Sequence, residues 1–250
     1  MRIPTSGLDL RCWEMGARRT FREPQTAVRS PGGIHRLRRN GPFRMKWQDE
    51  LFARFLGRVA RTLSFSRIEF RGQASSERRR IYYFNHTSHA DSVLLWAALP
   101  KVQRRKLRFV AAKDYWETSA LRRYVAERCF RAIFLERQPK TKEERQQQVS
   151  ELVSQVGPSE SILLSPEGTR GDGHQLAPFK SGIYYLCQAQ PDFELVPVYL
   201  ENLHRLLPKG AFVPRPVPCR VVFGEPFSLR EGESRVEFLE RARARLLELN

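Results

Sequence analysis

Short apolar runs rich in β-branched and aromatic residues recur along this chain, and stretches with helical features separate them. Two of the helical stretches start with a capping box, at Thr141 with Glu144 and at Ser234 with Glu237. Strands that alternate with helices along a chain are typical of α/β proteins. The sequence therefore predicts an α/β fold, with strands near residues 80–84, 108–112, 161–164 and 220–223.

A polar segment from Asn85 to Asp91 follows the first of these runs. His86 and Asp91 are five residues apart, which places two side chains about 140° apart on a helix and roughly 17 Å apart on a strand. They can meet only if His86 lies in a loop and Asp91 in the first turn of the next helix. The apolar residues 92–99, which Pro100 ends, supply such a helix. The pair is thus a candidate general base with its orienting carboxylate.

Two other interpretations of this segment stay open on the sequence alone. Ser88 and Asp91 also match a helix capping pattern, in which the carboxylate only satisfies free backbone amides. His89 competes with His86 for the role of base, although it is only two residues from Asp91, a spacing at which side chains do not face each other on a helix. The spacing by itself does not decide between catalysis and capping.

A second polar segment, Pro166 to Arg170, follows the apolar run at residues 161–164. In open α/β sheets, ligands bind where loops leave the carboxyl ends of strands. Gly168 permits a sharp turn and a close approach of the backbone to a ligand. Arg170 offers a planar fork of donors that suits a phosphate group, with Lys180 not far downstream. The segment predicts an anion site, unless it is an ordinary surface turn with a solvated arginine.

Four segments of the chain resemble, in order and spacing, the four motifs of the glycerolipid acyltransferases, and within that family the lysophosphatidic acid acyltransferases. The resemblance runs from about residue 46 to about residue 227. It implies a single α/β domain with a central, mostly parallel sheet flanked by helices. It rests on the His86/Asp91 block, residues 133–137, residues 166–170 and residues 195–198.

The resemblance also implies a reaction. In it, His86 takes the proton from the hydroxyl of a lysophospholipid as this hydroxyl attacks the thioester of acyl-CoA or acyl carrier protein, and Asp91 orients the base. The acceptor that the resemblance favours is 1-acyl-glycerol-3-phosphate, which would become phosphatidic acid in phospholipid biosynthesis. Neither a metal nor a cofactor besides the acyl donor is implied. The substrate-binding residues carried over from the motifs are Asn85, Arg137, Glu167, Gly168, Thr169 and Arg170.

Two positions depart from the family's usual pattern. The second motif commonly begins with glycine, where this chain has Arg131, and the third commonly has an aromatic residue, where this chain has Ser165. We expect both to lie near the acceptor site, so a different lipid acceptor remains an alternative. Arg137 also has Glu136 and two lysines as neighbours, and a solvated position is its other interpretation.

The first 44 residues differ from the rest. They hold ten arginines, three acidic residues and no lysine, and they show no apolar periodicity. Such a composition is typical of disorder, although an arginine-rich, acid-poor leader also fits a transit peptide. We expect residues 1–44 to be a disordered extension or the product of a mis-set start. Residues 45–250 are then the acyltransferase domain, a length that suits one hydrophobic core.

A segment near residues 51–63 predicts an amphipathic helix. Its apolar residues share one face and its arginines the other, which is typical of a helix at a membrane surface, but the same face could pack on the protein's own core. Outside the first 44 residues the net charge is +10, from 34 basic and 24 acidic residues, which favours an anionic membrane surface. Four dispersed cysteines favour a reducing compartment. We therefore expect a cytoplasmic protein associated peripherally with the inner face of the membrane.

A basic, non-catalytic nucleic-acid-binding or membrane-binding protein is the alternative of another class. The arginine run at residues 78–80, next to Tyr82 and Tyr83, could serve nucleic acid. Yet the chain holds no recognised nucleic-acid motif, and the two tyrosines fall in a strand expected in the core. We therefore expect no nucleic-acid partner.

Overall fold

The structure is a computed structural model and describes residues 46–72, 77–116, 118–136, 141–173, 175–208 and 213–250. All of them belong to one compact unit. The predicted extension at residues 1–44 and the candidate acceptor residue Arg137 lie outside the described residues.

A seven-stranded sheet forms the centre of this unit, in the order β1-β7-β6-β2-β5-β3-β4. Neighbouring strands are parallel except for β6 and β7, which are antiparallel. The predicted α/β fold with a mostly parallel sheet is therefore confirmed. The strands are β1 (Arg67–Phe70), β2 (Arg80–Phe84), β3 (Leu107–Ala112), β4 (Ile133–Leu135), β5 (Ser161–Leu164), β6 (Glu194–Glu201) and β7 (Arg220–Phe223).

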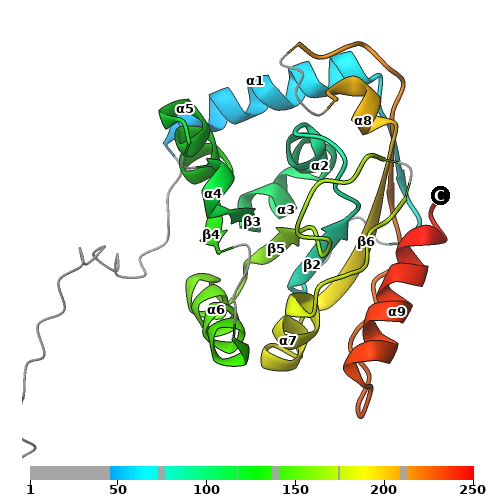
Figure 1. The fold of residues 1–250 in the computed structure, drawn as a ribbon. Coiled ribbons are helices and arrows are strands. Elements are labelled where there is room, and N and C mark those ends of the chain that lie inside the picture. Colours follow the sequence, from blue (N-terminus) through cyan, green and yellow to red (C-terminus); the bar gives the residue numbers. More distant parts are fainter. Residues whose placement is uncertain (1–45, 73–76, 117, 137–140, 174, 209–212) are drawn as a thin grey trace, which may run out of the picture. The chain divides into compact units, whose positions relative to one another are not determined.

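Helices cover both faces of the sheet, as Figure 1 shows. One face carries α1, α2 and α8, and the other carries α6, α7 and α9. The helices are α1 (Trp47–Ser64), α2 (Asp91–Ala98), α3 (Lys101–Lys106), α4 (Lys113–Trp116), α5 (Ala120–Tyr124), α6 (Lys142–Gln155), α7 (Gly182–Ala189), α8 (Leu203–Leu206) and α9 (Arg235–Leu247), with a π-helical turn at Val125–Cys129.

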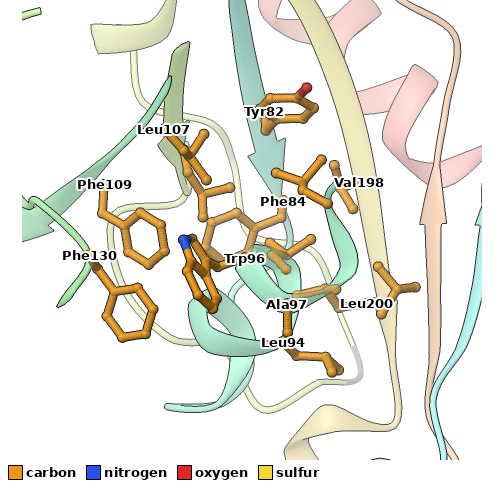
Figure 2. Packing of buried hydrophobic residues seen from close by; sticks show 14 of the residues in the cluster. Tyr82, Phe84, Leu94, Trp96, Ala97, Leu107, Phe109, Phe130, Val198 and Leu200 are labelled. Carbon is orange, nitrogen blue, oxygen red and sulfur yellow. The ribbon is translucent and has the colours of Figure 1, made fainter. Parts of the chain in front are cut away.

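Strand β2 shows how the sequence produces this layered core. All five of its residues are buried, because side chains of a strand alternate between the faces and both faces are covered. Tyr82 and Phe84 belong to the core cluster that also holds Trp96 and Leu94 of α2, and Trp96 lies beside Phe84 (Figure 2). The intervening residues Ile81 and Tyr83 pack in the second core, with α7 and α9. Strand β2 lies in the middle of the sheet. The loop at its carboxyl end is therefore in a position where ligand sites form in α/β proteins.

The capping boxes predicted at two helix starts are confirmed. Thr141 Oγ1 accepts from the Glu144 amide at 3.1 Å, and Ser234 Oγ accepts from the Glu237 amide at 3.3 Å. In both boxes the glutamate also accepts from the amide of the capping residue. Each cap satisfies amides that an isolated helix start leaves free.

The apolar face that the sequence predicted for α1 is partly buried and partly exposed. Phe52 and Leu56 pack against the core, and Gly57 allows a close approach to α2, since a Cβ there would lie 3.0 Å from Ala97 Cβ. Leu51 and Phe55, by contrast, are 52% and 60% exposed. Packing on the core therefore accounts for part of this face, and a second apolar stripe remains at the surface.

The Arg131 side chain is bound at the amino end of β5 and not at the predicted acceptor site, contrary to expectation. Its φ of +54° falls in the left-handed region, which explains why a glycine suits this position. The guanidinium pairs with Glu160, just before β5, and Arg108 pairs with the other carboxylate oxygen at 3.3 Å. These ion pairs lie at the amino end of β5, whereas Pro166–Arg170 follows its carboxyl end.

Candidate active site

His86 and Asp91 meet in the way that their spacing required. His86 lies in the loop after β2, Asp91 is the first residue of α2, and His86 Nδ1 is 2.9 Å from Asp91 Oδ2. The carboxylate is fully buried, whereas the imidazole is 27% exposed. One nitrogen of the ring is therefore held by the carboxylate, and Nε2 is left for a substrate.

The carboxylate of Asp91 also organises the loop itself. Its Oδ2 accepts hydrogen bonds from the amides of Thr87 at 2.7 Å and Ser88 at 2.8 Å. The capping box that Ser88 and Asp91 could form is not present: α2 begins at Asp91 with Ala90 at its N-cap and no side-chain cap, and Ser88 Oγ accepts instead from the Ala90 amide at 3.2 Å. Because this oxygen accepts from both amides, the hydrogen bond to His86 is matched by a ring proton on Nδ1, which leaves the lone pair on Nε2.

The two polar segments are bound to each other through backbone contacts. Glu167 Oε1 accepts from the His86 amide at 2.8 Å, and its Oε2 accepts from the Ala177 amide at 2.9 Å. The Gly171 amide donates to the His86 carbonyl at 2.8 Å. Burial raises the pKa of Glu167, while the two amides counteract this effect. Glu167 therefore fixes the two loops in register.

Asn85 has a similar structural task. Its Nδ2 donates to the Leu200 carbonyl at 2.9 Å, and its Oδ1 accepts from the Leu200 amide at 2.8 Å. Both atoms of the amide thus continue the β2–β6 pairing beyond the end of β2. The residue is buried, and it positions the loop that carries His86.

Gly168, Thr169 and Arg170 lie together on the open side of this arrangement. Gly168 has a φ of +71°, and a Cβ there would come within 2.8 Å of Lys180 Nζ. The Lys180 side chain therefore lies directly over the turn. The Arg170 guanidinium lies 5.6 Å from the centre of the Tyr115 ring. Two cations thus accompany the turn, as an anion site requires.

A cavity of about 940 Å³ opens beside His86. Its polar part includes His86, Gly168, Thr169, Arg170 and Lys180. Its apolar part lies over β3 and β5 and is lined by Phe84, Phe109, Phe130, Leu152, Leu164 and Ile183. One cavity thus joins a basic, hydrogen-bonding end to a long apolar end, which suits a lipid with an anionic head.

His89, the competing base, has a different partner. Tyr115 OH is 2.5 Å from His89 Nδ1, and the two rings are stacked at 4.8 Å. Burial, together with the nearby Arg170, lowers the pKa of His89 to about 4. The carboxylate of Asp91 contacts His86, so the geometry favours His86 as base.

Sequence reasoning did not single out Tyr115 or Thr87, whereas Ser165 was expected near the acceptor site and does line the cavity. Tyr115 lines the cavity and directly follows the carboxyl end of β3. The rule that sites form at the carboxyl ends of parallel strands applied to this strand as well and could have found it. Ser165 also lines the cavity, and its Oγ is buried without a hydrogen-bond partner among the described residues.

The features that a nucleic-acid interpretation needed are occupied within the fold. Tyr82 and Tyr83 are 1% and 0% exposed. Arg79 pairs with Asp192 at 3.0 Å and Arg80 with Glu194 at 3.3 Å. The two tyrosines are therefore part of the core, and the two arginines form ion pairs within the fold.

The site and the fold together define an α/β protein with a histidine–aspartate pair beside a lipid-sized cavity. Residues 67–201, more than half of the chain, match the Acyltransferase family model. The chain belongs to this acyltransferase family, which confirms the resemblance in its motifs.

Relatives of known type agree with this assignment. A 1-acyl-sn-glycerol-3-phosphate acyltransferase of Cocos nucifera is 26% identical over 194 residues, which is 77% of this chain and 60% of that protein. One of Limnanthes alba is 38% identical over 68 residues, 27% of this chain and 24% of the relative. The chain therefore spans less than two thirds of the length of either relative.

The same fold occurs in a solved structure. The 1-acyl-sn-glycerophosphate (LPA) acyltransferase from Thermotoga maritima superposes with a TM-score of 0.59 at 20% identity, covering 80% of this chain and 77% of that one. The likeness confirms that the two chains share the sheet and its flanking helices.

Proposed function

We propose that this acyltransferase moves a fatty acyl group from acyl-CoA or acyl carrier protein to the free hydroxyl of a lysophospholipid, with 1-acyl-glycerol-3-phosphate as the favoured acceptor. The observation that carries the proposal is the 2.9 Å contact between His86 Nδ1 and Asp91 Oδ2 at the edge of a cavity that is basic at one end and apolar at the other. The names of the relatives support the choice of acceptor.

In the proposed reaction, the acceptor oxygen attacks the carbonyl carbon of the thioester while His86 Nε2 takes its proton. The tetrahedral intermediate then collapses, the carbon–sulfur bond breaks, and the imidazolium returns the proton to the leaving thiolate. Asp91 stabilises the imidazolium in between and holds the ring in one tautomer. The chemistry involves no covalent acyl-enzyme, metal or further cofactor.

The proposed acceptor site uses the turn at Gly168–Arg170. Arg170 and Lys180 supply positive charge for the phosphate, and Thr169 supplies a hydroxyl at the cavity wall. Arg137 remains a predicted contributor. Glu167 and Asn85 act at one remove, because their polar atoms hold the loops that present His86 and Arg170. The apolar end of the cavity is the place for an acyl chain.

We further propose that α1 rests on an anionic membrane surface at the inner face of the membrane. Trp47, Leu51, Phe55 and Val59 recur every four residues and are exposed, Trp47 to 69%. Arg54, Arg58 and Arg61 flank them, which suits anionic headgroups. Among the residues that the structure describes, none of the helices is long and apolar enough to cross a bilayer.

The test is a direct assay of the transfer. Purified protein receives palmitoyl-CoA or palmitoyl acyl carrier protein with a panel of lysophospholipids, and free thiol is followed over time. We expect acceptor-dependent thiol release, with the diacyl product found by mass spectrometry. Thiol release that is the same with and without every acceptor would identify a thioesterase, and the proposal would then be wrong.

A further inference from the structure

A second cavity, of about 570 Å³, shares Arg170 as a lining residue with the cavity beside His86. Its wall is basic: it contains Arg170, Arg205 and Arg215, together with His204 and a single carboxylate, Asp172. Among the described residues of this wall, only Pro208 and Val217 contribute apolar side chains. This composition suits a polar, negatively charged group and does not suit an acyl chain.

The wall of the second cavity is fixed to the loop that carries His86. Ser88 Oγ donates to the Leu207 carbonyl at 3.1 Å, directly after α8. Gly173, with a φ of +87°, lies against the His204 ring, since a Cβ there would be 2.4 Å from His204 Nδ1. The Arg215 amide donates to the Leu206 carbonyl at 2.8 Å. Arg205 and Arg215 are therefore held at a defined place beside the site.

Two residues of this wall each carry a buried polar atom that has no hydrogen-bond partner among the described residues. Thr87 is only 9% exposed and lines the second cavity, yet its Oγ1 makes no hydrogen bond. Arg170 lines both cavities, and its Nη1 is buried and likewise unpaired. Unpaired buried donors are costly unless a ligand or water satisfies them. Thr87 directly follows His86 in the chain, and Arg170 belongs to the proposed acceptor site.

We propose that the second cavity receives the headgroup of the acceptor, beyond the phosphate that Arg170 binds. The inference rests on the proposed function and deepens it. Because Arg170 lines both cavities, a phosphate bound there adjoins both the lipid cavity and the second cavity. A water fills about 30 Å³, so a phosphate of five heavy atoms fills on the order of 150 Å³. The remaining space admits a substituent on the phosphate, and so a phosphodiester lysolipid.

The charges of the wall select the kind of substituent. Arg205 and Arg215 would repel a quaternary ammonium group, whereas they can donate to hydroxyl or anionic oxygens. Besides 1-acyl-glycerol-3-phosphate, the second cavity therefore admits lysophospholipids whose headgroup is hydroxyl-bearing or anionic. Lysophosphatidylglycerol is the probe for this class, and lysophosphatidylcholine with the same acyl chain is the matched counter-probe.

The experiment compares acceptors on the full chain with palmitoyl-CoA in one detergent, and subtracts thiol release without acceptor. In the unmodified protein, kcat/KM for lysophosphatidylglycerol should exceed that for lysophosphatidylcholine at least tenfold. Since Arg205 and Arg215 are exposed, each change to Ala should lower this ratio about threefold and both together about tenfold. The change should appear mainly in KM.

Two further variants make the test sharp. Arg205→Glu with Arg215→Gln places a negative charge in the cavity and should move the ratio toward choline, with unchanged melting temperatures. Arg235→Ala, an exposed arginine on α9, is the matched control and should leave the ratio as it is. The inference is wrong if 1-acyl-glycerol-3-phosphate is acylated but lysophosphatidylglycerol and lysophosphatidylcholine are used equally. It is also wrong if substitution of Arg205 and Arg215 leaves the ratio of the two kcat/KM values unchanged. If no acceptor at all is acylated, the proposed function fails as well.

Discussion

Asp91 Oδ2 lies 2.9 Å from His86 Nδ1 because the intervening loop wraps around the carboxylate. The amides of Thr87 and Ser88 donate to the same oxygen, at 2.7 and 2.8 Å. The carboxylate thus selects one backbone conformation for the loop and one ring nitrogen of the histidine. One carboxylate therefore fixes both the loop conformation and the orientation of the His86 ring. Substitutions at Asp91 and at His86 can be compared to separate these two effects.

Replacement of His86 should remove nearly all transfer. General-base catalysis typically contributes about 100- to 10,000-fold, so His86→Ala should lower kcat by this amount while the melting temperature stays close to that of the unmodified protein. His89→Gln is the matched control, since His89 contacts Tyr115 and not Asp91. A folded His86→Ala protein with near-normal kcat would exclude His86 as the base.

Replacement of Asp91 should affect both the loop and the base. Asp91→Asn keeps one oxygen for an amide but loses the charge that three donors share, so we expect a loss of about 1 to 3 kcal/mol in the free energy of unfolding. The loss in kcat should be smaller than that of His86→Ala, and the double variant should be no slower than His86→Ala alone. Additive losses in the double variant would mean that the two residues act independently.

The sequence predicted the parts of this site that depend on local pattern. The strand before His86, the helix that starts at Asp91 and the strand before Pro166 follow from short runs of apolar residues. The sequence predicted that His86 and Asp91 could meet only if His86 lies in a loop and Asp91 in the first turn of the next helix, and the structure has this arrangement. Local pattern and short-range geometry were sufficient here.

Long-range contacts were beyond the reach of the pattern. The bond from the His86 amide to Glu167 joins residues 81 positions apart, and that between Asn85 and Leu200 spans 115. Nothing in a single sequence indicates which backbone groups these side chains bind. Arg131 was misplaced for a similar reason, since its ion pair with Glu160 depends on how β4 and β5 align in the sheet. All three contacts depend on how the strands are arranged in the sheet, which the sequence did not provide.

Glu160 should make stability depend on pH in the acidic range. Burial by itself would raise the pKa of its carboxyl, but the Gly157 amide and the guanidinium groups of Arg131 and Arg108 outweigh burial and hold the pKa below its ordinary value. A group with a lowered pKa in the folded state stabilises the fold above its unfolded pKa, about 4.3, and loses this effect as the pH falls further. Thermal unfolding from pH 7 to pH 3 measures it.

The matched variant for this measurement is Glu160→Gln. At pH 7 it leaves the two arginines without their carboxylate, and we expect a loss of about 1 to 3 kcal/mol in the free energy of unfolding. As the pH falls below about 4, the difference from the unmodified protein should shrink, because the native carboxyl is then protonated too. A difference that stays constant down to pH 3 would contradict the assignment.

Gly168→Ala should disturb the acceptor site more than the fold. The positive φ of +71° costs a residue with a Cβ about 1 to 2 kcal/mol. The new methyl group would also push aside the end of the Lys180 side chain, which is flexible and can move. We expect a modest fall in melting temperature and a severalfold rise in the KM for the acceptor. Gly232→Ala, at a glycine with the same φ of +71° and open space around it, is the matched control and should leave KM unchanged.

Replacement of Arg170 tests whether the acceptor's phosphate is bound where the turn presents its guanidinium. Arg170→Ala removes a charge-assisted contact worth about 1.5 to 3 kcal/mol, or about 10- to 150-fold in acceptor binding. Arg170→Lys should restore part of this, because a point charge cannot reproduce a two-pronged contact. The loss should appear in the KM for the phosphate-bearing acceptor, while slow hydrolysis of the donor by water changes much less. Equal losses in transfer and hydrolysis, or equal use of a lipid alcohol without phosphate by the unmodified protein, would place the phosphate elsewhere and leave the role of His86 intact.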